Sequence, residues 1–189
     1  MNDGNKKKLS DLTLEELWLL FPINLVENNP LWSKWYHEEK KYLIKLITIE
    51  NIESINHIGS TNIKRIKAKP IIDILIEIKN NNLEKISKIL SENGYLEMNK
   101  TKKRISLNKG YTINGFSKKV FHIHLRYPGD NDEIYFIKYL NNHEKVAKEY
   151  EMLKEKLKVL YSYNRDAYTD GKKEFVKKYT EIAKKQYMK

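Results

Sequence analysis

The feature that most constrains this chain is a polar turn followed by a run of β-branched residues that carries one carboxylate. The turn is Gly59-Ser60-Thr61, and a short apolar stretch leads into it. The run that follows spans 70–78, is rich in isoleucine and contains Asp73. β-Branched residues favour strands, and Pro70 suits a strand's first position, where no ladder donor is lost. The pattern therefore predicts a turn that delivers a strand with an acid on one face.

A Gly-Ser turn before an acid-bearing strand is the layout of nucleotidyltransferase-type sites. The backbone N–H groups of such a turn can hold phosphate oxygens, and the strand carboxylate can hold Mg²⁺. Polymerase-like sites carry a second acid two residues further on, because side chains two apart share a strand face. Here that position is Leu75, and the next acid on that face is Glu77. The motif predicts a phosphate site with Mg²⁺, and an ordinary turn with a structural acid stays open beside it.

The composition favours one globular domain. The chain has 189 residues, of which 40% are hydrophobic and 32% charged, and this is enough to build a core. No apolar run reaches bilayer length and no signal-peptide pattern is present, so we expect a cytoplasmic protein without a membrane partner. Cysteine is absent, which excludes disulfides and thiolate metal sites. We expect residues 1–12 to be a flexible tail and residues 13–189 to form a single domain.

The net charge of +11 is compatible with nucleic-acid binding, because Lys and Arg neutralise phosphates. Most lysines, however, stand beside acids at helical spacing, as on a solvated surface. The abundance of Asn, Ile and Lys is also what an AT-rich genome produces without any nucleic-acid partner. Nucleic acid is therefore a secondary candidate partner.

Periodicity predicts an α/β (α+β) fold, with a mixed sheet flanked by helices and a helical C-terminal third. Strands are expected over 54–58, 70–78, 95–98, 103–108 and 119–127. Helices are expected over 14–20, 32–49, 82–93, 134–141, 143–161 and 165–187. Residues expected to face the core from the second helix are Trp35, Tyr42, Leu43, Leu46 and Ile47.

Five ordered blocks of this sequence resemble the GrpB family (glutamate-rich protein B). They are HIGST at 57–61, AKPIIDIL at 68–75, HIHL at 122–125, FIKYLNNHEKVAKEYEMLKEKL at 136–157 and YTDGKKEFV at 168–176. The resemblance runs from about Pro30 to Ala183. It implies a nucleotidyltransferase-like fold and similarity to the extra C-terminal domain of some bacterial dephospho-CoA kinases, but it implies no particular reaction. Where the family has Val-Pro-Gly-Leu after the turn, this chain has Ile63-Lys64-Arg65-Ile66.

The strand acid and the turn are the first candidates for a site. Asp73 is expected to be the metal ligand and, in an enzyme, the catalytic carboxylate. Gly59, Ser60 and Thr61 are expected to hold phosphate through backbone amides and hydroxyls, and Lys69 is close enough in sequence to reach it. A helix cap, a strand exit and an ion pair are the structural alternatives for these residues.

The polar face of the strand over 119–127 supplies the remaining candidates. His122 and His124 are two residues apart and therefore share a face, which suits a common metal or phosphate contact. Asp73 would be the third ligand if its strand lies alongside. Arg104 is expected on the same polar face, where it could clamp an anion. Two hydrogen-bonded histidines and an arginine salt bridge are the structural alternatives.

Two functions from different classes follow. The first is a nucleotidyltransferase-like protein that binds a nucleotide or phosphorylated small molecule with Mg²⁺ near Asp73. If it is an enzyme, it would be a nucleotidyl- or phosphoryl-transferase. The second is a catalytically degenerate module, lacking the second acid, that assists a partner enzyme such as a CoA-pathway kinase. The sequence predicts no oligomeric state.

Overall fold

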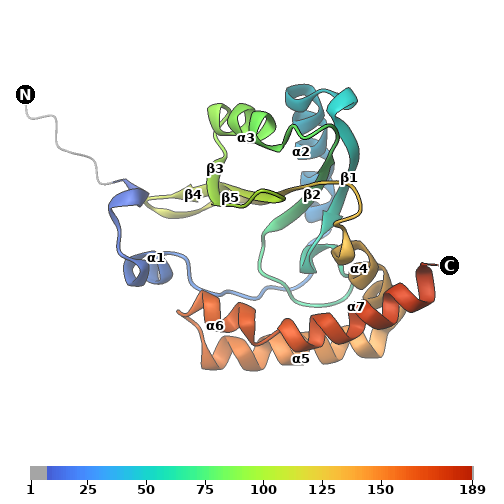
Figure 1. The fold of residues 1–189 in the computed structure, drawn as a ribbon. Coiled ribbons are helices and arrows are strands. Elements are labelled where there is room, and N and C mark those ends of the chain that lie inside the picture. The colour runs from blue at the N-terminus through green and yellow to red at the C-terminus, as the bar shows by residue number, and fades with distance from the viewer. Residues whose placement is uncertain (1–7, 189) are drawn as a thin grey trace, which may run out of the picture.

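A five-stranded mixed sheet forms the centre of the molecule (Figure 1). The computed structural model describes residues 8–188, and the part of the expected tail at residues 1–7 lies outside them. The strand order is β1-β2-β5-β4-β3, and within the sheet only the β2–β5 pair is parallel. The strands are β1 (Ile52–Ile58), β2 (Ile72–Ile78), β3 (Leu96–Lys100), β4 (Arg104–Thr112) and β5 (Gly115–Arg126).

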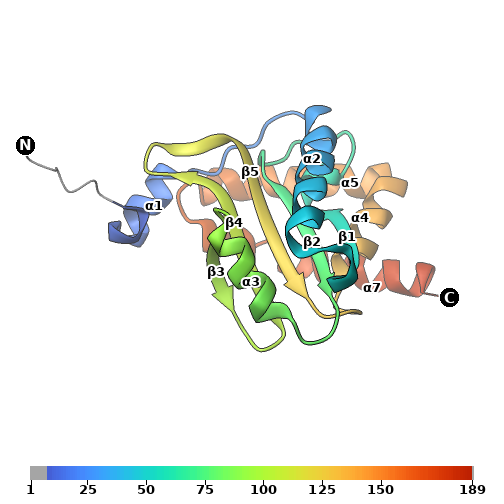
Figure 2. The same cartoon turned by 90° about the horizontal axis from the view of Figure 1, so that it is seen from above.

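Two helices, α2 (Leu31–Ile47) and α3 (Leu83–Glu92), cover one face of the sheet. Figure 2 shows both of them lying across that face. The alternate residues of β2 from Ile72 to Ile78 point toward these helices and are fully buried. Burial of such side chains contributes about 1.5–3 kcal/mol each, so this layer is the main core.

The predicted core-facing side of α2 is confirmed at Leu43 and Ile47, with Trp35 and Leu46 partly buried against the core, and is wrong at Tyr42. The buried residues of α2 are Trp32, Tyr36, Glu39, Leu43 and Ile47, whereas Tyr42 is 38% exposed. The reason is that Glu39 lies in the middle of the buried stripe and breaks its apolar pattern. Its carboxylate accepts hydrogen bonds from the Tyr95 hydroxyl and, at 2.7 Å, from the Lys109 ammonium, which compensates its burial.

The helical C-terminal third packs on the opposite side of the sheet, as Figure 1 shows, and confirms that part of the predicted fold. It consists of α4 (Asp132–Asn142), α5 (Glu144–Leu160), α6 (Arg165–Asp170) and α7 (Lys173–Tyr187). The single helix expected over 165–187 is wrong, because the chain breaks at Gly171 and Lys172 between α6 and α7. A Cβ on Gly171 would overlap the side chain of Leu157 in α5, so this position allows the close approach of the break to α5.

The hairpin of β4 and β5 is longer than predicted, and the N-terminal segment packs against its tip. Helix α1 (Leu14–Leu20) is capped by Thr13, whose hydroxyl accepts from the Glu16 N–H at 3.2 Å. After α1, the ring of Phe21 packs 4.7 Å from Tyr111 and 4.9 Å from Phe116 of the hairpin, between ring centroids. None of the described helices is both long and apolar enough to cross a bilayer.

The connector after the Gly-Ser turn contains a residue in the left-handed region. This residue is Arg65, whose φ is 61°. A non-glycine residue pays a steric cost in this region. The Arg65 carbonyl accepts from the Lys148 ammonium at 2.8 Å, and its guanidinium pairs with Glu144 at 3.1 Å. These contacts tie the connector to α5.

Candidate functional site

The parallel pairing of β2 and β5 brings the predicted strand acid and both predicted histidines together. Asp73 is in register with His122, and Leu75 with His124. The Oδ1 atom of Asp73 lies 3.2 Å from Nδ1 of His122 and 3.4 Å from Nε2 of His124. All three side chains are partly buried. They face the helical layer formed by α4–α7 rather than the helices α2 and α3. We call these residues the Asp-His-His triad.

The second acid of a polymerase-like strand has no counterpart here. Leu75 occupies that position and is fully buried. Glu77, on the same face, is 4% exposed and serves a structural role. Its carboxylate accepts from the Gly129 N–H at 2.7 Å and from the Asn131 amide at 3.0 Å, which holds the loop between β5 and α4. Asp73 is therefore the one carboxylate that β2 presents to the site.

The Gly-Ser turn passes directly against Asp73. Gly59 has a φ of 74°, and a Cβ there would lie 2.9 Å from the Cβ of Asp73 and closer still to its carboxylate. Ser60 is hydrogen-bonded to Tyr150 of α5, and it lines a cavity that also contains Asp73. Thr61 instead turns inward: its hydroxyl donates to the Ile71 carbonyl at 3.1 Å and contacts His57 at 2.9 Å. Gly59 and Ser60 therefore line the cavity, whereas Thr61 and His57 support the turn.

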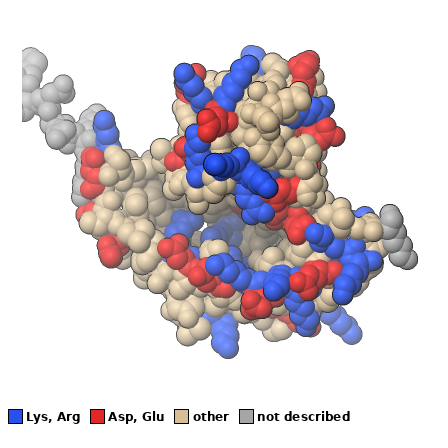
Figure 3. Space-filling model, in the orientation of Figure 1, with Lys and Arg blue, Asp and Glu red and all other residues tan. Residues whose placement is uncertain are grey.

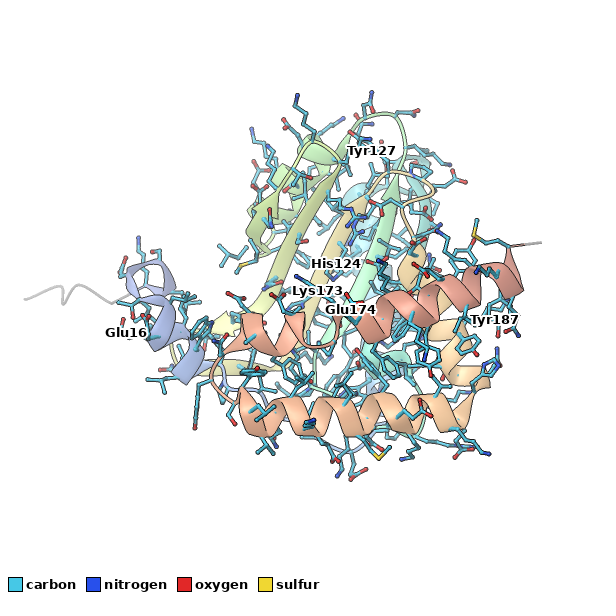
Figure 4. All side chains as sticks on the ribbon, turned by 60° about the horizontal axis from the view of Figure 1, so that its bottom comes forward. Glu16, His124, Tyr127, Lys173, Glu174 and Tyr187 are labelled. Carbon is cyan, nitrogen blue, oxygen red and sulfur yellow. The ribbon has the colours of Figure 1, made fainter. Side chains whose placement is uncertain are left out.

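A cavity of about 390 Å³ separates the triad from the helical layer. Figure 3 shows the hollow between the sheet and the helices below it, with Lys and Arg side chains recessed inside. In Figure 4, His124 lies over the junction of α6 and α7, which the labels of Lys173 and Glu174 mark. Phosphorylated small molecules are of a size that such a cavity can hold.

Lysines without carboxylate partners line the side of the cavity opposite the triad. The ammonium groups of Lys69 and Lys172 lie 5.2 Å and 4.4 Å from the ring centroid of Tyr168. Neither forms an ion pair with any residue that the structure describes. The break between α6 and α7 is what places Lys172 here. Buried cations are ordinarily paired, so this arrangement leaves room for an anion.

Sequence reasoning missed two further cations of the cavity, Lys154 and Arg165. Lys154 is 1% exposed, and its ammonium donates to the Lys67 carbonyl. It shares a helical stripe with Ala147, Tyr150 and Leu157, so a lysine at an apolar phase of α5 was the available signal. Arg165 donates to the Tyr111 hydroxyl at 3.1 Å, and no local pattern marked it.

Burial and mutual repulsion weaken the charged forms of these lysines. Burial, together with the neighbouring charges of Lys172 and Arg165, lowers the pKa of Lys69 to about 7. Burial likewise lowers the pKa of Lys154 to about 7 and that of Lys172 to about 8. A bound anion would reverse this effect, because an opposite charge favours the charged form of an amine.

The carboxylate of Asp73 stays ionised beside these groups. Burial alone would raise its pKa, but hydrogen bonds from His122 and His124 outweigh burial and hold the pKa well below its usual value. Burial lowers the pKa of His122, with Asp73 opposing that shift. The cavity therefore combines the ionised carboxylate of Asp73, with Glu133 and Asp166 also in its lining, with three lysines whose pKa values are lowered to about 7 to 8.

Arg104 does not join the other predicted site residues. Its guanidinium binds Asp130 through two hydrogen bonds, of 2.7 Å and 2.6 Å, and its side chain is 57% exposed. It lines a neighbouring groove along α7. Arg126, from the same polar face, pairs with Asp130 at 3.2 Å and Glu133 at 3.0 Å. Both arginines are occupied by carboxylates in the structure.

The triad does not match the ligand preferences of Mg²⁺. That ion takes oxygen ligands in octahedral geometry, usually one or two carboxylates together with substrate phosphates and water. Two of the three donor atoms here are imidazole nitrogens, Nδ1 of His122 and Nε2 of His124. Of the three residues only Asp73 is a usual ligand of Mg²⁺.

Comparison with known proteins places the chain in one family. The family model of the GrpB protein matches residues 22–182. The UPF0157 protein YqkA of Bacillus subtilis is 34% identical over 169 residues, which are 86% of this chain and 48% of YqkA. The glutamate-rich protein GrpB of Alkalihalophilus pseudofirmus is 35% identical over 159 residues, which are 80% of this chain and 90% of that protein. This chain thus spans about half the length of YqkA.

The solved structure of a GrpB protein agrees with this placement. The crystal structure of the conserved protein GrpB from Enterococcus faecalis superposes with a TM-score of 0.76 at 26% identity, covering 88% of this chain and 100% of that one. A distant similarity, with a TM-score of 0.41 at 12% identity, exists to the Cid1 poly(U) polymerase over 75% of this chain and 44% of the polymerase. Because the family model spans residues 22–182, the chain belongs to the GrpB family.

Proposed function

We propose that this protein binds a nucleotide or another phosphorylated small molecule in the cavity between the triad and α6. The observation that supports this proposal is the convergence of Lys69 and Lys172, which form no ion pair with residues 8–188, on the cavity that holds Asp73. Phosphate oxygens would accept from these ammonium groups and from the turn at Gly59 and Ser60. A divalent metal, with Asp73 as its carboxylate ligand, completes the proposal.

The test is ligand binding by the wild-type chain and two double variants of equal charge. Thermal unfolding is followed with nucleotides and CoA precursors, with and without divalent metal. A ligand at a hundred times its Kd raises the free energy of unfolding by about 2.7 kcal/mol. We expect Lys69→Gln with Lys172→Gln to weaken binding at least tenfold, because each lost contact is a charge-assisted hydrogen bond.

The control variant combines Lys45→Gln and Lys88→Gln. Both lysines are exposed, lie on α2 and α3 across the sheet, and form no ion pair within residues 8–188. The control lowers the net charge by the same amount and is expected to leave binding unchanged. Equal weakening in both double variants would show that general surface charge, and not the cavity, attracts the ligand.

A second function, a non-catalytic module that assists a partner enzyme, is favoured by the buried Leu75 in the place of a second acid. It predicts saturable binding to a CoA-pathway kinase without any stabilisation by nucleotides or CoA precursors. Turnover of a nucleotide by the wild-type chain, lost in Asp73→Asn, would contradict it.

A further inference from the structure

Two histidines flank Asp73 where a polymerase-like layout would use further acids. The three donor atoms of the Asp-His-His triad all lie within 4.8 Å of one another. We infer that the triad is a binding site for a first-row transition-metal ion, Zn²⁺ or Fe²⁺, in preference to Mg²⁺. Imidazole nitrogen suits these ions, and two histidines with one carboxylate form a recurrent set for them.

The two distances from Asp73 to the histidines are longer than those of short charge-assisted hydrogen bonds and match the spacing of two ligands on one ion. Bonds of about 2.0–2.2 Å to one tetrahedral ion place neighbouring ligand atoms about 3.3–3.6 Å apart. The structure has 3.2 Å from Asp73 Oδ1 to His122 Nδ1 and 3.4 Å to His124 Nε2. A charge-assisted N–H···O⁻ bond would bring the same atoms to about 2.7–2.9 Å.

An outer partner fixes the ring of His122. The hydroxyl of Tyr111 lies 2.8 Å from Nε2 of His122 and accepts from the Arg165 guanidinium at 3.1 Å. The ring of His122 is thereby held with Nδ1 toward Asp73. Metal-binding histidines usually have such a partner on the second nitrogen, which orients the ring. Tyr111 is therefore a positioning residue for the metal.

The remaining side of the triad opens into the cavity that Lys69 and Lys172 line. Three protein ligands leave a coordination position for water or for an oxygen of a ligand. The inference deepens the proposed function and rests on it only in placing the metal beside the bound anion. The metal site itself can be tested without any anion.

The experiment uses the untagged full chain, stripped with EDTA and transferred to metal-free buffer. Calorimetric titration with Zn²⁺ is expected to show one ion per chain, bound at least 100-fold more tightly than Mg²⁺. Co²⁺ serves as a visible probe of the same site through its absorption bands. Asp73→Asn and His124→Gln are each expected to weaken Zn²⁺ binding at least 100-fold.

Matched variants separate the triad from other histidines. His37→Gln, on the exposed side of α2, is expected to leave Zn²⁺ affinity unchanged. Tyr111→Phe is expected to lower it about 10- to 100-fold, as loss of an outer-shell partner does. Urea unfolding shows which variants fold. If His124→Gln does not fold, paramagnetic broadening by Co²⁺ of the His122 and His124 ring signals in the wild-type chain decides the question.

The inference is overturned if His37→Gln and His124→Gln bind Zn²⁺ equally well, if Co²⁺ leaves those ring signals unbroadened, or if Mg²⁺ binds as tightly as Zn²⁺. Its failure is distinguishable from failure of the proposed function. Sulfate binding to the EDTA-treated chain, compared between wild type and the Lys69→Gln and Lys172→Gln double variant, tests the anion site alone. Lysine-dependent sulfate binding without Zn²⁺ binding would leave the proposed function standing.

Discussion

At the level of single residues, position 59 requires glycine for two separate reasons. Its φ of 74° is a conformation that L side chains rarely adopt, and its backbone lies against the Asp73 side chain. Gly94 has a similar φ of 87° but nothing within 4 Å of the place where a Cβ would stand. The two glycines therefore differ in crowding and not in backbone conformation.

We predict that Gly59→Ala destabilises the protein more than Gly94→Ala does. Gly94→Ala should lower the free energy of unfolding by about 1–2 kcal/mol, the cost of a side chain in the left-handed region. Gly59→Ala should cost about 1–3 kcal/mol more, because its methyl group must displace Asp73. Urea unfolding of both variants measures the difference, and equal losses would show that Asp73 moves aside freely.

The residues of the triad could be predicted from sequence because strand alternation is strict. A period of two places His122 and His124 on one face whatever the strand's neighbours are. That β2 pairs with β5, and so brings Asp73 beside them, is a matter of sheet order, which local sequence does not encode. Lys154 and Arg165 were missed for the same reason: their proximity to Asp73 depends on how α5 and α6 dock.

Among the secondary-structure elements, the break between α6 and α7 contributes most to the site. The residues around it, from Tyr168 to Val176, have no proline, so periodicity alone favours a continuous helix. Gly171 is the local signal, yet its backbone is helical, with φ of −60° and ψ of −15°. Its role is visible only in the contact with Leu157. Tertiary packing thus decides where the helix ends.

A double-mutant cycle tests this contact. A Cβ on Gly171 would lie 3.1 Å from Cδ1 of Leu157 and closer to Cδ2. We predict that Gly171→Ala alone lowers the free energy of unfolding by about 1 kcal/mol through overpacking. In a Leu157→Ala background, which itself should cost about 2–5 kcal/mol, the same change should be neutral or stabilising, because the space is vacant. Strictly additive effects in urea unfolding would mean that the two positions do not touch.

For the molecule as a whole, the distribution of charge matters more than the net charge of +11. Surface lysines such as Lys67, Lys100 and Lys119 pair with glutamates at 2.8, 3.0 and 2.7 Å, and such exposed pairs are screened by salt. The lysines of the cavity form no ion pair with any described residue and are partly or fully buried, so salt screens them less. This contrast favours a small anion over an extended nucleic acid as the ligand.

The same cations couple the stability of the whole fold to pH. The pKa values of Lys69 and Lys154 are about 7 in the folded chain and that of Lys172 is about 8, against 10.5 for an ordinary lysine. Between pH 7 and 10.5 these three lysines therefore bind more protons in the unfolded chain than in the folded chain. We predict that the contribution of these three lysines to the free energy of unfolding rises with pH across this window, because the penalty of burying charged amines disappears as they discharge.

Comparison with a variant isolates this effect from the many other groups that titrate in the same range. Urea unfolding at intervals from pH 7 to 10 should show a smaller rise for Lys69→Met than for wild type, while the exposed control Lys45→Met should follow the wild type. Sulfate keeps its charge over this range, so its affinity for the wild-type chain should fall as the lysines discharge. A sulfate affinity independent of pH, or equal slopes in all three proteins, would mean that these lysines keep their charge in the folded chain.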